Sequence, residues 1–80
     1  FRTTAFAAQQ AGVDGAIVQH WAQRSVAIAR QVCREFSPPR WVLGSLALLA
    51  DCYQPERTPA DAILAREHAR SVDWLLQAGC

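Results

Sequence analysis

Apolar residues recur at helical spacing along most of the chain, and this pattern predicts four helices. The predicted helices cover residues 4–11, 15–36, 39–53 and 59–78. Proline and glycine stand at the predicted boundaries, and the sequence contains no run in which apolar and polar residues alternate as in a half-buried strand. We therefore predict an all-α fold, in which a short helix precedes three longer ones in an up-down bundle, within a single domain that covers residues 1–80.

The second and fourth predicted helices are amphipathic, and local signals mark their ends. The inner face of the fourth helix carries Leu64, Ala65, His68, Ala69, Val72, Leu75 and Leu76. Asp14 is the expected N-cap of the second helix, and Thr58 is the expected N-cap of the fourth. Thr3 or Thr4 can cap the first helix, and Gly79 is the expected C-terminal stop of the last.

The third predicted helix is apolar on nearly all sides. Its apolar residues are Trp41, Val42, Leu43, Leu46, Leu48, Leu49, Cys52 and Tyr53. A helix of this kind must be buried on most sides, and two neighbouring helices in a chain of 80 residues cannot cover it fully. Since the chain also begins at Phe1 rather than Met, we expect it to be part of a longer chain or of an assembly.

Composition excludes some classes of function. Eight Arg and seven acidic residues give a net charge of +1, which argues against a nucleic-acid-binding protein. The longest uninterrupted apolar run, Leu46 to Ala50, has five residues and cannot span a membrane. The chain has no Lys, Asn or Met, which indicates GC-rich codons and a bacterial source. We expect a cytoplasmic protein, because no signal peptide is visible.

The cysteines and histidines do not have the spacing of a metal site. The sequence contains no Cys-x-x-Cys and no His-x-x-x-His among its three Cys and two His. In an up-down bundle His20 would lie at the level of Cys52, and Cys33 at the level of His68, which makes two separate pairs. We therefore expect no metal and no cofactor.

The remaining candidate chemistry is modest. Cys33 and Cys80 would lie toward the same end of an up-down bundle, where a disulfide can form; the alternative is two free thiols. His68 lies in the middle of an apolar stripe and is expected to be a packing residue. Ser25 and Ser45 lie inside predicted helices without a glycine-rich turn or a neighbouring base, so no catalytic residue is predicted.

Residues 41–79 resemble a helical hairpin of the tetratricopeptide repeat family. The residues that fit the family pattern are Leu49, Ala50, Tyr53, Ala62 and Ala69. Arg57 and Trp74 depart from it, at positions where a turn glycine and a closing proline are typical. The resemblance implies a protein that binds protein partners and performs no chemistry.

The sequence thus predicts a non-catalytic protein–protein interaction module, such as an adaptor, a chaperone or an assembly subunit. Its partner would be another protein or a second copy of the chain. Trp74, Ile63, Arg70 and Trp41 are the expected contact residues. For Trp74, the alternative is burial beneath the first helix through Phe6. The alternative functions are a regulatory bundle that binds a small apolar ligand and, ranked lower, a fragment of an enzyme.

Overall fold

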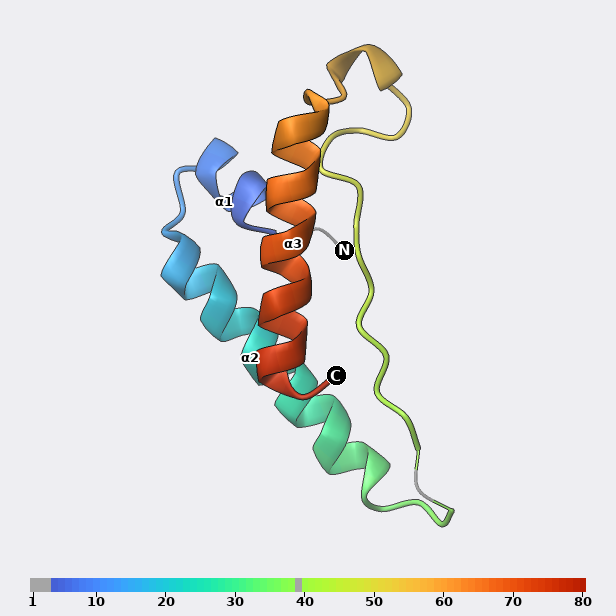
Figure 1. Ribbon diagram of the computed structural model, residues 1–80. Helices are drawn as coiled ribbons and strands as arrows, with labels where there is room; N and C mark the ends of the chain where they lie inside the picture. Colours follow the sequence, from blue (N-terminus) through green and yellow to red (C-terminus); the bar gives the residue numbers. More distant parts are fainter. Residues whose placement is uncertain (1–3, 39) are drawn as a thin grey trace.

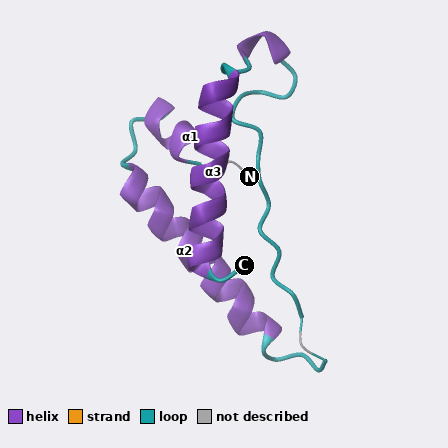
Figure 2. Cartoon of the chain, viewed as in Figure 1, coloured by secondary structure: helices purple, strands orange, loops and turns teal. Residues whose placement is uncertain are grey.

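The computed structural model describes residues 4–38 and 40–80, and within them the chain is built from helices and loops. The helices are α1 (Ala5–Gln10), α2 (Gly15–Cys33) and α3 (Asp61–Ala78), and a short 3-10 helix, η1, spans Pro55–Arg57 (Figures 1 and 2). The described residues contain no strand. The predicted all-α class is confirmed, whereas the predicted up-down arrangement and the predicted number of helices are not.

Local capping explains where these helices begin and end. The Thr4 side chain accepts a hydrogen bond of 3.1 Å from the Ala7 N–H, and Asp14 Oδ1 accepts one of 2.8 Å from the Ala16 N–H. Gly79 ends α3 in the left-handed conformation, with φ of 96°. The prediction that Thr58 caps the last helix is wrong, because that helix begins at Asp61 and has no side-chain cap. The alternative cap Thr3 lies outside the described residues.

The three helices pack together around a small core. Helices α2 and α3 pack against each other and run in the same direction, while α1 contacts both of them (Figure 1). Between α2 and α3 the chain returns along the length of the molecule. The buried apolar side chains are Ala5, Ala8, Val18, Ala22, Val26 and Leu49. None of the described helices is long and apolar enough to cross a membrane.

The predicted helix at residues 39–53 is wrong. Pro39 lies outside the described residues, and residues 40–48 run as an extended segment without helical hydrogen bonds (Figures 1 and 2). A short apolar run is typical of a fully buried strand as well as of a buried helix, and periodicity alone does not separate the two. Trp41 and Val42 favour extended backbone, and Gly44 disfavours helix, so the local preferences agree with the observed conformation.

The extended segment, residues 40–48, leaves its backbone and several of its large side chains uncovered. Among the described residues, no backbone–backbone hydrogen bond involves this segment. Trp41 is 90% exposed, Leu43 is 86% exposed and Leu48 is 61% exposed, whereas Leu49, directly after the segment, is only 3% exposed. Cover for this region from a longer chain or from an assembly stays a prediction.

Candidate functional site

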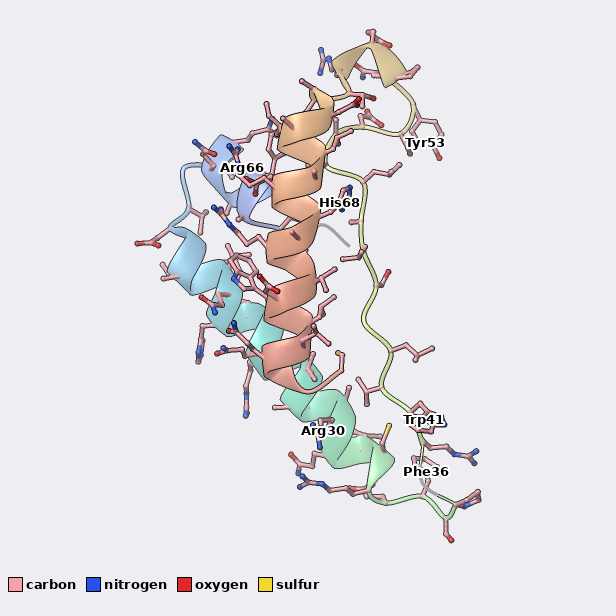
Figure 3. All side chains as sticks on the ribbon, in the orientation of Figure 1. Arg30, Phe36, Trp41, Tyr53, Arg66 and His68 are labelled. Carbon is pink, nitrogen blue, oxygen red and sulfur yellow. The ribbon has the colours of Figure 1, made fainter. Side chains whose placement is uncertain are left out.

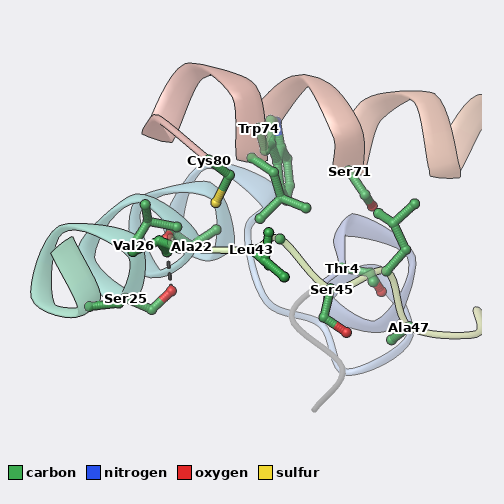
Figure 4. Close-up of a pocket in the computed structure, with 15 residues that line it drawn as sticks. Thr4, Ala22, Ser25, Val26, Leu43, Ser45, Ala47, Ser71, Trp74 and Cys80 are labelled. Atoms are coloured by element: carbon green, nitrogen blue, oxygen red, sulfur yellow. Dashed lines mark hydrogen bonds between the residues drawn. The ribbon is translucent and has the colours of Figure 1, made fainter. Parts of the chain in front are cut away.

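The extended segment lies beside α2 and α3 and forms a central cavity with them. The cavity has a volume of about 360 Å³ and is lined mainly by apolar and hydroxyl-bearing side chains (Figure 4). Ser25 Oγ donates a hydrogen bond of 2.8 Å to the Ala22 carbonyl oxygen, and Ser71 Oγ donates one of 2.9 Å to the Glu67 carbonyl oxygen. None of the side chains that line it is charged. The central cavity therefore suits an apolar or weakly polar group better than a charged one.

A close approach at Gly44 fixes the extended segment against α3. A Cβ atom added at Gly44 would lie 2.8 Å from Leu75 Cδ1 and 3.3 Å from Leu75 Cβ. Both distances are shorter than ordinary carbon–carbon contacts, so a larger residue would push the extended segment away from α3. Gly44 thus sets the width of the central cavity, since both residues line it.

Gly44→Ala is expected to destabilise the chain by about 1–2 kcal/mol, because the added methyl group overpacks the contact with Leu75. The matched control is Gly15→Ala, since nothing lies within 4 Å of a Cβ added at Gly15. At that helical position Ala is expected to be neutral or stabilising by up to about 1 kcal/mol. Urea denaturation followed by circular dichroism measures both values; equal effects of the two substitutions would contradict the close approach.

A second cavity brings a histidine, a thiol and a carboxylate to the beginning of α3. This histidine cavity, of about 240 Å³, is lined by His68 together with Asp51 and Cys52 and by apolar residues that include Leu49. His68 is half-buried and points from α3 toward the loop that follows the extended segment (Figure 3). An imidazole side chain is a common general base in enzymes.

Asp51 shapes the loop that closes the histidine cavity. Its Oδ1 accepts a hydrogen bond of 3.0 Å from the Tyr53 N–H, and its Oδ2 accepts one of 3.3 Å from Gln54 Nε2. These bonds turn the chain toward η1. The carboxylate therefore has a structural role in addition to its position at the cavity wall.

The sequence analysis predicts that His20 lies at the level of Cys52, and Cys33 at the level of His68. Both predictions are wrong. Cys52 shares its cavity with His68, and Cys33 lines a different cavity together with Cys80. The reason is the rise per residue, which is about 3.3 Å in extended chain and 1.5 Å in a helix. An extended stretch carries Cys52 farther along the molecule than a helix would.

A third cavity, of about 590 Å³, lies where α2 and α3 end and is rich in arginine. This basic cavity is lined by Arg30, Cys33, Arg34, Phe36, Arg40, Trp41, Val42, Gly79 and Cys80. Arg30, Phe36 and Trp41 lie at the same end of the molecule in Figure 3. Arg30 Nη1 donates a hydrogen bond of 3.1 Å to the Gly79 carbonyl oxygen, and the Arg40 guanidinium lies 5.7 Å from the Phe36 ring centroid.

The four residues expected to contact a partner do not occupy one cavity. Trp74 is half-buried and lines the central cavity, whereas Trp41 lines the basic cavity. Ile63 is half-buried, and Arg70 is exposed with its Nη1 3.6 Å from Glu67 Oε2. A role for these four residues in binding a partner stays a prediction. A Cys33–Cys80 disulfide also stays a prediction; all three thiols are free in the structure. The described residues contain no group of three or more His, Cys, Asp or Glu that could hold a metal ion.

Comparison with known families gives the class of protein. The model of an enzyme family matches the chain along its whole length, residues 1–80. That family is homocysteine S-methyltransferase, and the chain belongs to it. No curated protein and no solved structure gave a match to the chain.

Family membership corrects three sequence-based interpretations. The resemblance to tetratricopeptide repeats is wrong, since the whole chain matches a methyltransferase family and residues 40–48, within the supposed first helix of the hairpin, are extended. The prediction of a non-catalytic adaptor, chaperone or interaction module is wrong, and so is the prediction that the protein is not an enzyme. The lower-ranked alternative, part of an enzyme, fits the family. No sequence motif that we considered pointed to methyl transfer.

Proposed function

We propose that the protein containing these residues transfers a methyl group to the sulfur of homocysteine. The observation that supports this function is the family match, which covers residues 1–80 without leaving any segment aside. In such a transfer the acceptor thiol loses its proton, and its sulfur then attacks the methyl carbon. A new S–C bond forms while the bond between the methyl group and the donor breaks, and the donor keeps that electron pair.

The histidine cavity is our candidate for the place where the acceptor thiol loses its proton. His68 and His20 are the two histidines of the chain, and of the two only His68 lines one of the three cavities described above. An imidazole side chain can act as the general base toward a thiol. Leu49, which is buried, lines the same cavity as His68 and would give the reacting sulfur an apolar wall on one side.

The charged ends of homocysteine require more than these cavities provide. The central cavity has no charged side chain, and the charged residues of the basic cavity are all Arg. An amino acid needs partners for both its ammonium and its carboxylate. We propose that further contacts come from a longer chain or from an assembly, which would also cover Trp41 and Leu43. A cytoplasmic location also remains our proposal.

Methyl transfer is expected to depend on His68 and not on His20. The test incubates homocysteine with S-adenosylmethionine or glycine betaine, as sulfonium and quaternary ammonium donors, and measures methionine by mass spectrometry. His68→Gln is expected to lower the rate by about 100-fold or more, as loss of a general base does.

His20→Gln is the matched control, because His20 is exposed and lines none of the three cavities. It is expected to leave the rate within about twofold of wild type, as for a surface substitution away from the site. Absence of methionine with both donors would argue against the proposed reaction. A His68→Gln variant with the wild-type rate would remove only the assignment of the base.

A further inference from the structure

The basic cavity holds a pair of thiols that the methyl transfer proposed above does not use. Cys33 is the last residue of α2, and Cys80 follows Gly79, the residue that ends α3. Both thiols are free, and both line the basic cavity. A hydrogen bond from Arg30 Nη1 to the Gly79 carbonyl oxygen links the two helix ends. Arg30 lies about one helical turn before Cys33, and Gly79 directly precedes Cys80.

The charged side chains that line the basic cavity are all positive. Arg30, Arg34 and Arg40 line the cavity, and no Asp or Glu lines it among the described residues. In the described part of the chain, Glu67 forms ion pairs with Arg66 and Arg70. Neither Arg34 nor Arg40 takes part in an ion pair there. A cavity with three guanidinium groups attracts small anions and raises their local concentration. A negatively charged thiol compound would therefore reach Cys33 and Cys80 more readily than a neutral one.

We propose that Cys33 and Cys80 form a reversible disulfide by exchange with a small anionic disulfide, such as glutathione disulfide, in the basic cavity. The Cys33 thiol loses its proton and its sulfur attacks one sulfur of the small disulfide, which forms a mixed disulfide and releases one glutathione thiolate. The Cys80 thiol then loses its proton and its sulfur attacks Cys33 Sγ. This step forms the Cys33–Cys80 bond and releases the second glutathione.

The electrons balance in this exchange. The two protein thiols are oxidised to one disulfide, and glutathione disulfide is reduced to two glutathione molecules, which take up the two protons. The bond would join the end of α2 to the end of α3 and constrain residues 34–79 between them. The oxidised chain is therefore expected to melt at a higher temperature than the reduced chain.

Cys52 provides an internal control for the proposed exchange. It is exposed, but it lines the histidine cavity rather than the basic cavity. The full chain is reduced, exposed to glutathione disulfide and alkylated, and its unreduced peptides are then mapped by mass spectrometry. We expect a peptide that links Cys33 to Cys80, with Cys52 alkylated, and we expect the same link in Cys52→Ser.

The single variants separate the two steps of the exchange. Cys80→Ser should stop at a mixed disulfide between glutathione and Cys33, and in Cys33→Ser no intramolecular bond should form. A wild-type chain in which Cys52 is bonded to Cys33 or to Cys80, or in which no intramolecular disulfide forms, would overturn the proposal. Because none of these readouts involves methyl transfer, failure of the proposed enzymatic activity would not affect them.

The role of charge is tested with a second disulfide that carries none. Arg34→Gln is expected to slow disulfide formation with glutathione disulfide by about fivefold. This factor corresponds to roughly 1 kcal/mol, which is the interaction energy of two unit charges about 4 Å apart in water. The rate with hydroxyethyl disulfide should not change. Arg24→Gln is the matched control, since Arg24 is an exposed residue of α2 that does not line the basic cavity. Equal slowing with both disulfides would overturn the role of the arginines.

Discussion

Leu49→Asp is expected to unfold the chain. Leu49 is 3% exposed, the lowest value among the buried apolar residues, and it lies where the extended segment meets the core. The substitution removes buried apolar area and places a carboxylate at a buried position, at a combined cost of about 5 kcal/mol or more. A domain of this size has a total free energy of unfolding of roughly 4–12 kcal/mol, so most or all of the stability would be lost.

The neighbouring residue provides the control for this prediction. Leu48 is 61% exposed, so Leu48→Asp introduces the same charge one position earlier without burying it. Its expected cost is below about 1 kcal/mol. Thermal and urea denaturation followed by circular dichroism compare the two variants. A cooperative transition for Leu49→Asp within about 1 kcal/mol of wild type would show that Leu49 is not buried as described.

The second large effect is expected at Glu67, where the ion pairs are asymmetric in burial. The Glu67 side chain is 5% exposed, whereas its partners Arg66 and Arg70 are 63% and 47% exposed. Arg66 Nε lies 3.0 Å from Glu67 Oε1, and Arg70 Nη1 lies 3.6 Å from Glu67 Oε2. Removal of both arginines leaves a buried carboxylate without a partner, at a cost of about 2–3 kcal/mol.

Removal of the carboxylate instead leaves only two solvated arginines. Glu67→Gln is therefore expected to cost less than about 1 kcal/mol, although it breaks the same two ion pairs. The comparison is between the double variant Arg66→Ala, Arg70→Ala and the single variant Glu67→Gln in urea denaturation. If the two variants lost the same stability, the cost would come from the pairs themselves rather than from the burial of one partner.

Sequence reasoning succeeded where the structure depends on neighbouring residues. The caps formed by Thr4 and Asp14, and the stop at Gly79, follow from local hydrogen bonding and backbone preference, so the main bounds of all three helices could be predicted to within about three residues. The amphipathic pattern of α2 is buried only in part, because Val18 and Ala22 are buried whereas Trp21 and Ile28 are 54% and 49% exposed.

It failed at residues 40–48, where the local pattern of apolar residues does not decide between helix and extended chain. The stretch from Trp41 to Leu49 is apolar apart from Gly44 and Ser45, a pattern that fits both a buried helix and a buried strand. A helix at residues 39–53 would place Cys52 at the level of His20, whereas Cys52 and His68 line the same cavity in the structure. Ala62 and Ala69 suggested a repeat hairpin because alanines at this spacing are common in helices of alanine-rich chains. Homology to a methyltransferase family is not visible in any of these local patterns.

The extended segment also has a consequence for how the chain behaves in solution. From Trp41 to Ala50 the sequence has no charged residue and no proline, and the backbone amides of the described segment are unpaired. Segments of this kind can stack edge to edge into intermolecular β-sheets. Wherever nothing covers this segment, we expect it to promote aggregation of the chain.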